Sequence, residues 1–319
     1  MPGRLTIGID LGGTQVRAAL VEEGRILRRA AARTDSSGGP TAVLEQFKQL
    51  ISEICTPEDW ARLSGLGVSA PGPLDSETGT VIHIPTLPHW ESVALRDILA
   101  ADLGLPVVIE NDGIAAAYGE WKYGAGTGLR HLVYVTVSTG IGGGVVVDGH
   151  LMHGRRGMAG HVGHFRMAPD GPLCSCGVAG CFEAFASGTS LGKRALKSAQ
   201  NNPDSLLGKM SAGEAVDARH VVEGARQGDP LCLELLREEA AYLGSGFTSL
   251  IHLFSPECII MGGGVSKGFD LMQRGIHDVI RRDAMEPFKT VPVVPAGLGD
   301  NSGLVGAAAL ACAASPELQ

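Results

Sequence analysis

Four side chains of the types that bind soft metal ions lie close together in this chain. They are His164, Cys174, Cys176 and Cys181, with the spacing His-x9-Cys-x-Cys-x4-Cys. Zn²⁺ prefers a tetrahedral shell of nitrogen and sulfur, and a shell closed by four protein ligands is typical of a structural site. Three buried free thiols and a core histidine are the alternative, which is disfavoured because the other four cysteines are scattered singly. The spacing therefore predicts a structural zinc site that shapes a wall of a binding site.

Two glycine-rich loops follow β-rich segments and have the composition of phosphate-binding loops. Backbone N–H groups in such loops can cradle phosphate oxygens. Ordinary hairpin turns use glycine for the same backbone reasons, but two equivalent loops, the first beginning near a carboxylate, favour a triphosphate site. Asp10, at the end of the first strand, can hold Mg²⁺ directly or through water. The loop residues are Gly12, Gly13 and Thr14, and then Thr139, Gly140, Gly142 and Gly143.

A possible acceptor site begins at Asn111 and Asp112, which follow the apolar segment Val107–Ile109. A carboxylate at the end of a strand can accept the proton of a substrate hydroxyl as that hydroxyl attacks phosphorus. Asp is equally suited to cap the helix predicted over Gly113–Tyr123. The residues alone leave these two roles comparable.

Taken together, these motifs resemble those of the ROK family (repressors, uncharacterised reading frames and sugar kinases). The resemblance spans almost the whole chain and implies an α/β fold: the duplicated, actin-like (ribonuclease-H-like) sugar kinase fold of two domains with an interdomain cleft. The motifs are Asp10-Leu-Gly-Gly-Thr14, Glu110-Asn-Asp112, Ser138-Thr-Gly-Ile-Gly-Gly-Gly144, the His/Cys segment and Met261-Gly-Gly-Gly264.

The resemblance also implies an activity: ATP-dependent phosphorylation of the 6-hydroxyl of a hexose or N-acylhexosamine, with Asp112 as general base. Candidate sugars are glucose, mannose, N-acetylmannosamine and N-acetylglucosamine, and the implied cofactors are ATP, Mg²⁺ and structural Zn²⁺. The implied sugar-binding residues are Gly72, Asn111, Asp112, His161, His164 and Glu183. The implied nucleotide-binding residues are the loop residues above with Asp10, Gln15, Gly263 and Gly264. His164 would bind zinc through one nitrogen and a sugar oxygen through the other.

Two positions depart from the pattern of glucokinase-like members of the family. Those members commonly have Glu where this chain has His161, so a group that can donate replaces an anionic acceptor. The resulting His-x-x-His form looks like that of bacterial N-acetylmannosamine kinases. Thr86 stands where many relatives have Asn, and its shorter side chain would leave more room in the pocket. Neither change decides which sugar is bound.

The order of predicted elements repeats itself. A strand, a glycine-rich turn and a returning strand occur over 5–32 and again over 132–147, where Gly140–Gly143 is predicted as the turn and Val145–Val147 as the returning strand. Helices are predicted over Thr41–Ile54, Pro230–Leu253 and Ser302–Ala314. We expect an N-terminal domain over 1–115, joined by a returning helix at about 301–319, and a second domain over 116–300 that carries the zinc loop.

Composition narrows the class of protein. With 319 residues, the chain is long enough for two domains, and its net charge of −8 argues against a nucleic-acid partner. The lack of a signal-like or membrane-spanning segment predicts a cytoplasmic protein without a membrane partner. The family resemblance implies a homodimer or a dimer of dimers. A sugar-binding regulator or sensor without kinase activity is the alternative; we expect the kinase, since Asp10 lies too near the start for a preceding winged helix.

Overall fold

The computed structural model describes residues 4–84, 86–210 and 216–314. Contacts divide the chain into two compact units: unit 1, Met1–Leu129, Gly144–Gly160 and Asp300–Gln319, and unit 2, Arg130–Gly143 and His161–Gly299. The domain border expected after residue 115 falls inside helix α4 (Asp112–Tyr123) and stays a prediction. Of the expected C-terminal helix, residues 315–319 lie outside the described part of the chain.

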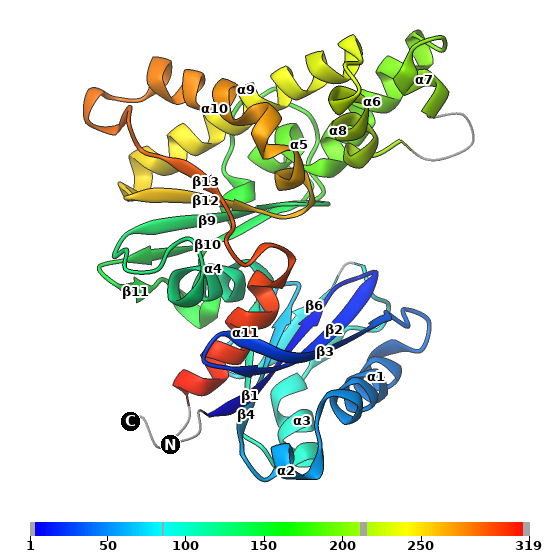
Figure 1. Cartoon of the computed structure of the whole chain (residues 1–319), viewed down its shortest axis with the longest axis vertical. Coiled ribbons are helices and arrows are strands. Elements are labelled where there is room, and N and C mark those ends of the chain that lie inside the picture. Colours follow the sequence, from blue (N-terminus) through cyan, green and yellow to red (C-terminus); the bar gives the residue numbers. More distant parts are fainter. Residues whose placement is uncertain (1–3, 85, 211–215, 315–319) are drawn as a thin grey trace. The chain divides into compact units, whose positions relative to one another are not determined.

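Unit 1 is built around a five-stranded sheet with the order β3-β2-β1-β4-β8 (Figure 1). Its strands are β1 (Leu5–Leu11), β2 (Gln15–Glu22), β3 (Arg25–Arg33), β4 (Leu63–Ala70) and β8 (Val107–Asn111). A smaller sheet comprises β5 (Leu74–Asp75), β6 (Thr80–His83) and β7 (Glu91–Val93). The helices are α1 (Gly39–Ile54), α2 (Pro57–Trp60), α3 (Leu95–Leu103), α4, the short η1 (Arg155–Gly157) and α11 (Ser302–Ala313).

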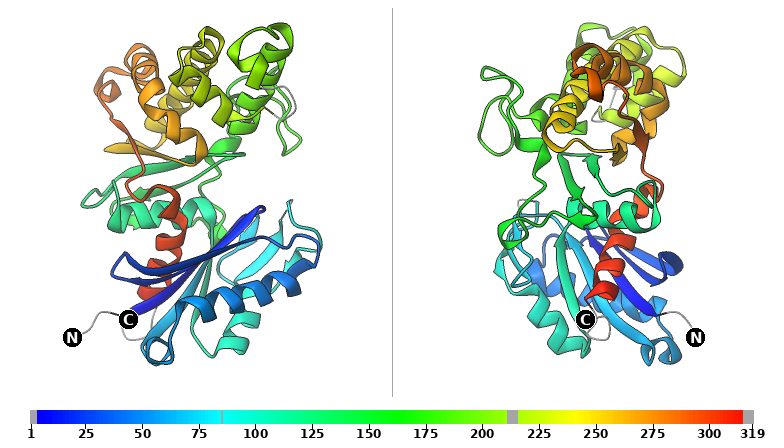
Figure 2. Two further views of the ribbon diagram at one scale, coloured as in Figure 1. Left: turned by 45° about the vertical axis from the view of Figure 1, so that its right-hand side comes forward. Right: turned by 90° about the vertical axis from the view of Figure 1, so that its left-hand side faces the viewer.

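The two faces of this sheet are covered by different kinds of packing. Large apolar side chains of β1, including Ile7 and Ile9, share one core with Phe47 of α1. On the other face α11 lies almost directly on the strand backbone (Figure 2). A Cβ added at Gly8 would lie 2.1 Å from the carbonyl oxygen of Leu304. The small residues of α11 therefore permit a close approach that larger side chains would prevent.

The second large sheet has the order β11-β10-β9-β12-β13, which matches the order of the first sheet. This match confirms the predicted duplication. Its strands are β9 (Leu132–Val137), β10 (Ile141–Val147), β11 (His150–Leu151), β12 (Cys258–Gly262) and β13 (Val293–Pro295). By contacts, β11 and the end of β10 belong to unit 1.

The remaining helices of unit 2 cover its part of this sheet, where α9 and α10 pack against each other. Their bounds are η2 (Val162–His164), α5 (Phe182–Ala186), α6 (Gly188–Asn201), α7 (Leu206–Met210), α8 (Ala218–Arg226), α9 (Pro230–Phe254), η3 (Gly264–Gly268), α10 (Phe269–Asp283) and η4 (Glu286–Phe288). A last short turn, η5 (Gly299–Asn301), leads into α11. The four helices predicted from the sequence correspond to α1, α4, α9 and α11.

One expected turn is placed differently. Gly140–Gly143 was predicted as the turn, but β10 already begins at Ile141, so Gly142 and Gly143 are strand residues. The reason for glycine here is close packing: a Cβ at Gly143 would lie 2.3 Å from the carbonyl oxygen of Tyr134. The turn that follows β10 lies at Asp148-Gly149, a pair typical of hairpins, with positive φ at both residues.

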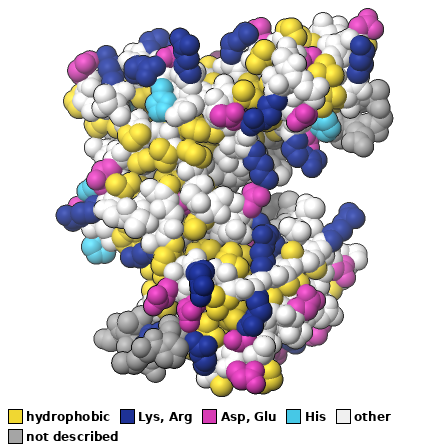
Figure 3. All heavy atoms as spheres, in the orientation of Figure 1, with side chains coloured by type: hydrophobic (Ala, Val, Ile, Leu, Met, Phe, Trp, Pro, Cys, Tyr) yellow, Lys and Arg dark blue, Asp and Glu magenta, His cyan; other side chains and the backbone are white. Residues whose placement is uncertain are grey.

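Among the described residues, none of the helices combines the length and the apolar character needed to cross a lipid bilayer. On the face drawn in Figure 3, acidic and basic side chains of the described residues occur in small mixed groups. This mixture agrees with the modest net negative charge of the chain.

Candidate active site and metal centre

In unit 1, polar side chains line up at the carboxyl ends of three neighbouring parallel strands. Asp10 on β1 is opposite Ser69 on β4, and Ser69 is opposite Glu110 on β8. The Ser69 hydroxyl donates to Asp10 Oδ1 at 3.1 Å. Because ligands of α/β sheets commonly bind at this edge, the row marks the part of unit 1 best suited to a site.

Asp10 also has a cationic partner that our sequence analysis did not identify. Arg17 Nε donates to Asp10 Oδ2 at 3.0 Å, and Arg17 Nη1 donates to the carbonyl of Asp300 at 2.6 Å. Asp10 and Arg17 are directly opposite in the β1–β2 hairpin, so its register could have revealed the pair. The positive charge of Arg17 offsets the negative charge of the Asp10 carboxylate, so Asp10 repels a nearby polyphosphate less. The carboxylate oxygens of Asp10 are also the hard ligands that Mg²⁺ prefers.

The first glycine loop connects β1 to β2 and is open to solvent. The Gly12 N–H donates to the Gln15 carbonyl at 3.0 Å and closes the turn, while Gly13, Thr14 and Gln15 are exposed. A Cβ at Gly13 would lie 2.8 Å from Thr86 Oγ1, so Thr86 lies beside this loop.

Asn111 and Asp112 mark the start of α4. Asn111 is the capping residue: its Oδ1 accepts the Gly113 N–H at 3.0 Å, and Asp112 Oδ1 accepts the same N–H at 2.8 Å. Asp112 is therefore the first helical residue, where the helix dipole favours a carboxylate. Gly72 is adjacent, because a Cβ there would lie 3.2 Å from Asn111 Nδ2.

Glu110 and His153 form a second pair that our sequence analysis did not identify. Glu110 is 2% exposed, its Oε1 accepts the Asn111 N–H at 2.8 Å, and its Oε2 lies 3.2 Å from His153 Nε2. The hydrogen bond to Glu110 raises the pKa of His153 above its usual value, against the opposing effect of burial. The two residues are far apart in the sequence, and no local pattern predicts their contact.

In unit 2, the second glycine loop and Gly263 lie side by side. The loop turns over Ser138, Thr139 and Gly140, where the Ser138 N–H donates to the Gly140 carbonyl at 2.9 Å. Gly263 follows β12 with φ 86°, and a Cβ there would lie 2.4 Å from the carbonyl oxygen of Val137. The backbone at the ends of β9 and β12 therefore forms one surface. This surface continues into Gly264, where η3 begins.

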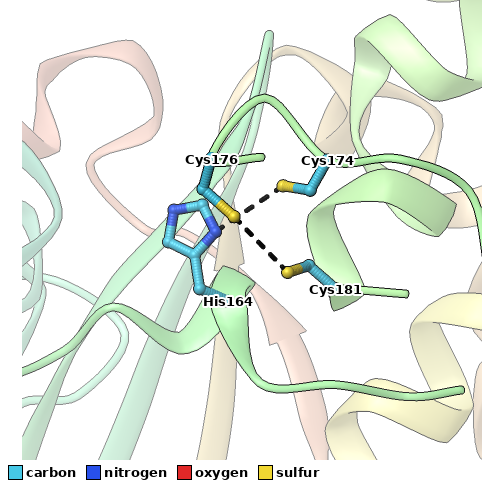
Figure 4. A group of neighbouring side chains, drawn as sticks. All are labelled: His164, Cys174, Cys176 and Cys181. Carbon is cyan, nitrogen blue, oxygen red and sulfur yellow. Dashed lines mark hydrogen bonds between the residues drawn. The ribbon is translucent and has the colours of Figure 1, made fainter. Parts of the chain in front are cut away.

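The four predicted metal ligands come together in unit 2 (Figure 4). Their ligand atoms all lie within 4.8 Å of one another; Cys176 Sγ is 3.7 Å from Cys181 Sγ, and Cys174 Sγ is 3.7 Å from His164 Nδ1. Ligands about 2.0–2.3 Å from a tetrahedral zinc ion are about 3.3–3.8 Å apart, so the cluster fits this metal. His164 turns Nδ1 toward the cluster, which leaves Nε2 for another partner.

The pKa values of two thiols in this cluster are shifted in opposite directions. Burial, then hydrogen bonds from the neighbouring thiols, raises the pKa of Cys181. The Val178 backbone N–H is the main cause that lowers the pKa of Cys176. A bound cation would stabilise the thiolates that burial disfavours.

The remaining predicted sugar ligands of unit 2 lie next to the metal cluster. The His161 and His164 rings stack with their centroids 6.4 Å apart. The Glu183 carboxylate accepts the Ile141 N–H at 2.9 Å through Oε2 and the Ser175 hydroxyl at 2.7 Å through Oε1. Glu183 thus lies between the glycine loop and the metal loop, a position that the sequence did not reveal.

Two α/β units with matching sheet orders and glycine loops at strand ends define a protein of the two-domain sugar kinase fold. The family model described as "ROK family" matches residues 6–314, and the chain belongs to this family. It is 36% identical to a glucokinase of Thermotoga maritima, over 97% of this chain and 98% of that protein. It is 32% identical to an N-acetylmannosamine kinase of Salmonella typhi, over 96% of this chain and 98% of that protein.

Among solved structures, the chain is similar to the ROK family glucokinase from Streptomyces griseus in complex with glucose and AMPPNP. The TM-score is 0.85 at 38% identity, and the match covers 96% of this chain and 98% of that chain.

Proposed function

We propose that this protein transfers a phosphoryl group from ATP to the 6-hydroxyl of a hexose or an N-acylhexosamine. The observation that carries the proposal is the row of Asp10, Ser69 and Glu110 at the carboxyl ends of parallel strands, which leads directly into Asn111 and Asp112. It gives unit 1 a carboxylate suited to a metal–nucleotide complex and a second carboxylate suited to a sugar hydroxyl. Its relatives with kinase names support this assignment.

In the proposed reaction, Asp112 accepts the proton of the 6-hydroxyl as its oxygen attacks the γ-phosphorus. Asn111 holds neighbouring sugar hydroxyls, and Gly72 offers a backbone contact beside it. Phosphoryl transfer depends mainly on positioning and charge neutralisation, so one oriented carboxylate is sufficient as the base. The backbone N–H groups of the two glycine loops bind the phosphates, and Asp10 is the proposed ligand of the Mg²⁺ that accompanies ATP.

We assign zinc to the cluster of His164 and the three cysteines. Zinc would fix the orientation of the His164 ring, so that Nε2 is available to a sugar oxygen. His161 and Glu183 are the other proposed sugar ligands of unit 2. His161 can donate a hydrogen bond where an acidic residue would only accept one, which favours a sugar that presents an acceptor such as an N-acetyl carbonyl.

A coupled ADP-release assay with Mg-ATP tests the proposal against glucose, mannose, N-acetylmannosamine and N-acetylglucosamine. Preference for an N-acetyl sugar would identify His161 as the specificity residue. Preference for glucose would show that histidine can replace glutamate at this position in a glucokinase. Lack of turnover with all four sugars would contradict the proposal and favour a sugar-binding regulator.

The role of Asp112 is tested with Asp112→Asn. Because asparagine keeps a similar shape but cannot accept a proton, we expect kcat to fall at least about 100-fold. Sugar affinity, measured by calorimetry, should stay within about threefold of wild type, since the other contacts remain. Asp97→Asn, at an exposed position on α3, is the control and should turn over normally. Unchanged kcat in Asp112→Asn would exclude this residue as the base.

Homodimer formation stays a prediction from the family resemblance, and cytoplasmic location stays a prediction from the sequence. A regulator or sensor without kinase activity is the alternative function, and the same assay distinguishes it.

A further inference from the structure

The carboxylate of Glu183 uses both of its oxygens to join two loops of unit 2. Oε1 accepts the Ser175 hydroxyl at 2.7 Å, and Oε2 accepts the Ile141 N–H at 2.9 Å. Ser175 lies between the metal ligands Cys174 and Cys176, while Ile141 directly follows the turn of the second glycine loop. The Cys174 thiol also lies 3.4 Å from Oε1. The metal loop thus presents two donors, the Ser175 hydroxyl and the Cys174 thiol, to the same oxygen of Glu183.

The contact between Glu183 and the glycine loop has no spare room. A Cβ at Gly140 would lie 2.4 Å from Glu183 Oε2. A displacement of the carboxylate toward the loop would therefore meet the Gly140 backbone, and a displacement away would break the bond to Ile141. The position of this loop thus depends on the position of Glu183.

The same short segment makes further contacts with the loop. The Gly188 N–H donates to the Ser138 carbonyl at 2.7 Å, and the Thr189 hydroxyl donates to the Thr139 carbonyl at 2.7 Å. Residues 181–189 therefore run from the metal ligand Cys181 to the glycine loop, with Glu183 between them.

This connecting segment is held firmly. Phe182 is fully buried, stacks on Phe165 and meets Phe247 edge to face. Arg194 donates to the Phe185 carbonyl at 2.6 Å and pairs with the buried Glu239 of α9. Because α5 is anchored in this way, it is not a loose segment that would absorb a change in the positions of Ser175 and Cys181, which join the metal loop to Glu183.

We propose that Glu183 and Ser175 couple the metal site to the phosphate-binding loop, so that metal binding strengthens nucleotide binding even when no sugar is present. The proposal rests on the proposed function, because it takes the 138–143 loop as the one that binds phosphate. Coupling of this kind is reciprocal: nucleotide must raise the affinity for the metal by the same factor by which the metal raises the affinity for nucleotide.

The test uses the full-length zinc-bound protein, the analogue AMPPNP with Mg²⁺, and no sugar. The Kd for AMPPNP is measured by calorimetry for wild type, Ser175→Ala, Glu183→Gln and the control Ser52→Ala. Ser52 is an exposed serine of α1 whose hydroxyl donates to the Gln49 carbonyl of its own helix, which makes it a matched substitution. Zinc content is measured by atomic emission, and zinc affinity by competition with a colorimetric chelator, with and without saturating AMPPNP.

We expect Ser175→Ala to retain one zinc per chain and to bind AMPPNP about fivefold more weakly than wild type. Glu183→Gln should lose at least as much, and Ser52→Ala should match wild type. Saturating AMPPNP should raise the zinc affinity of wild type about fivefold, and this factor should approach one in Ser175→Ala.

Wild-type AMPPNP affinity in zinc-bound Ser175→Ala and Glu183→Gln would overturn the coupling. Equal zinc affinity with and without AMPPNP in the wild type would also overturn it. In both cases the wild type still binds nucleotide, so the proposed function stands. A wild-type protein that does not bind AMPPNP contradicts the proposed function itself, and the coupling with it.

Discussion

At the scale of single residues, the candidate acceptor site depends on a buried carboxylate. Glu110 holds the backbone of Asn111 through one oxygen and meets His153 through the other. A buried carboxylate without a cationic partner is costly, and His153 supplies that partner when it is protonated. The pair thus positions the residues that precede the proposed base.

This arrangement predicts a pH dependence of stability. The pKa of His153 is raised in the folded protein, so its contribution is fully present below the ordinary histidine pKa of about 6.5 and is lost as pH rises through the raised value. His153→Gln keeps a neutral donor but does not titrate. Between about pH 6 and pH 9, the free energy of unfolding, measured in urea, should fall more for wild type than for this variant.

The His153 side chain is 46% exposed, so screening by solvent makes the effect small. His83→Gln is the control, because His83 and Glu91 are exposed and 3.8 Å apart, and it should follow the wild-type profile. A wild-type profile in His153→Gln would show that the charge of His153 does not stabilise the fold.

At the scale of elements, α11 joins α4 and the first sheet by close backbone packing. A Cβ at Gly306 would lie 1.8 Å from the Ala115 carbonyl oxygen, and one at Gly67 would lie 1.9 Å from the Ala307 carbonyl oxygen. Backbone cannot move aside as a flexible side chain can. This helix is therefore fixed against the sheet whose strand ends carry Asp10 and Asn111.

We expect Gly306→Ala to destabilise the protein by about 3 kcal/mol, because one added methyl group forces α11 away from α4. Chemical denaturation measures the effect. Ala313→Ser, which changes an exposed residue of the same helix, should alter stability by less than about 0.5 kcal/mol. Equal stability of Gly306→Ala and wild type would mean that the two helices have room to separate.

At the scale of the whole molecule, the proposed site residues are divided between two compact units. Asp10, Asn111 and Asp112 belong to unit 1, whereas the metal cluster, His161 and Glu183 belong to unit 2. Each large sheet has the same strand order, so the chain uses one arrangement twice and adds the metal loop to the second copy. The metal should therefore stabilise unit 2 locally.

Metal removal tests whether the metal stabilises unit 2 alone. Because a bound metal would join four ligands of one loop, chelation should speed amide hydrogen exchange at least about tenfold over residues 164–181. The strands β1 and β4 of unit 1 should keep their protection, and added Zn²⁺ should restore the original pattern. Equal loss of protection in both units would show that the metal supports the whole molecule.

The sequence by itself determined the features that local spacing encodes. These features are the His-x9-Cys-x-Cys-x4-Cys segment, the strand–turn–strand repeat and the small residues of α11. Each depends on residues close together in the chain, so side-chain periodicity and ligand spacing predict them. The order of the motifs along the chain resembled that of the family and so predicted the two-domain fold.

Tertiary structure decided what no spacing encodes. The contacts of His153 with Glu110 and of Glu183 with Ile141 join residues about 40 positions apart, so only the folding of intervening elements brings them together. Gly142 and Gly143 show the same limit: glycine marked a turn in the sequence, yet it serves a strand that approaches Tyr134 closely. Glycine can be required for a positive φ in a turn or for close packing against a neighbouring segment. Only the position of that segment in space distinguishes these two reasons.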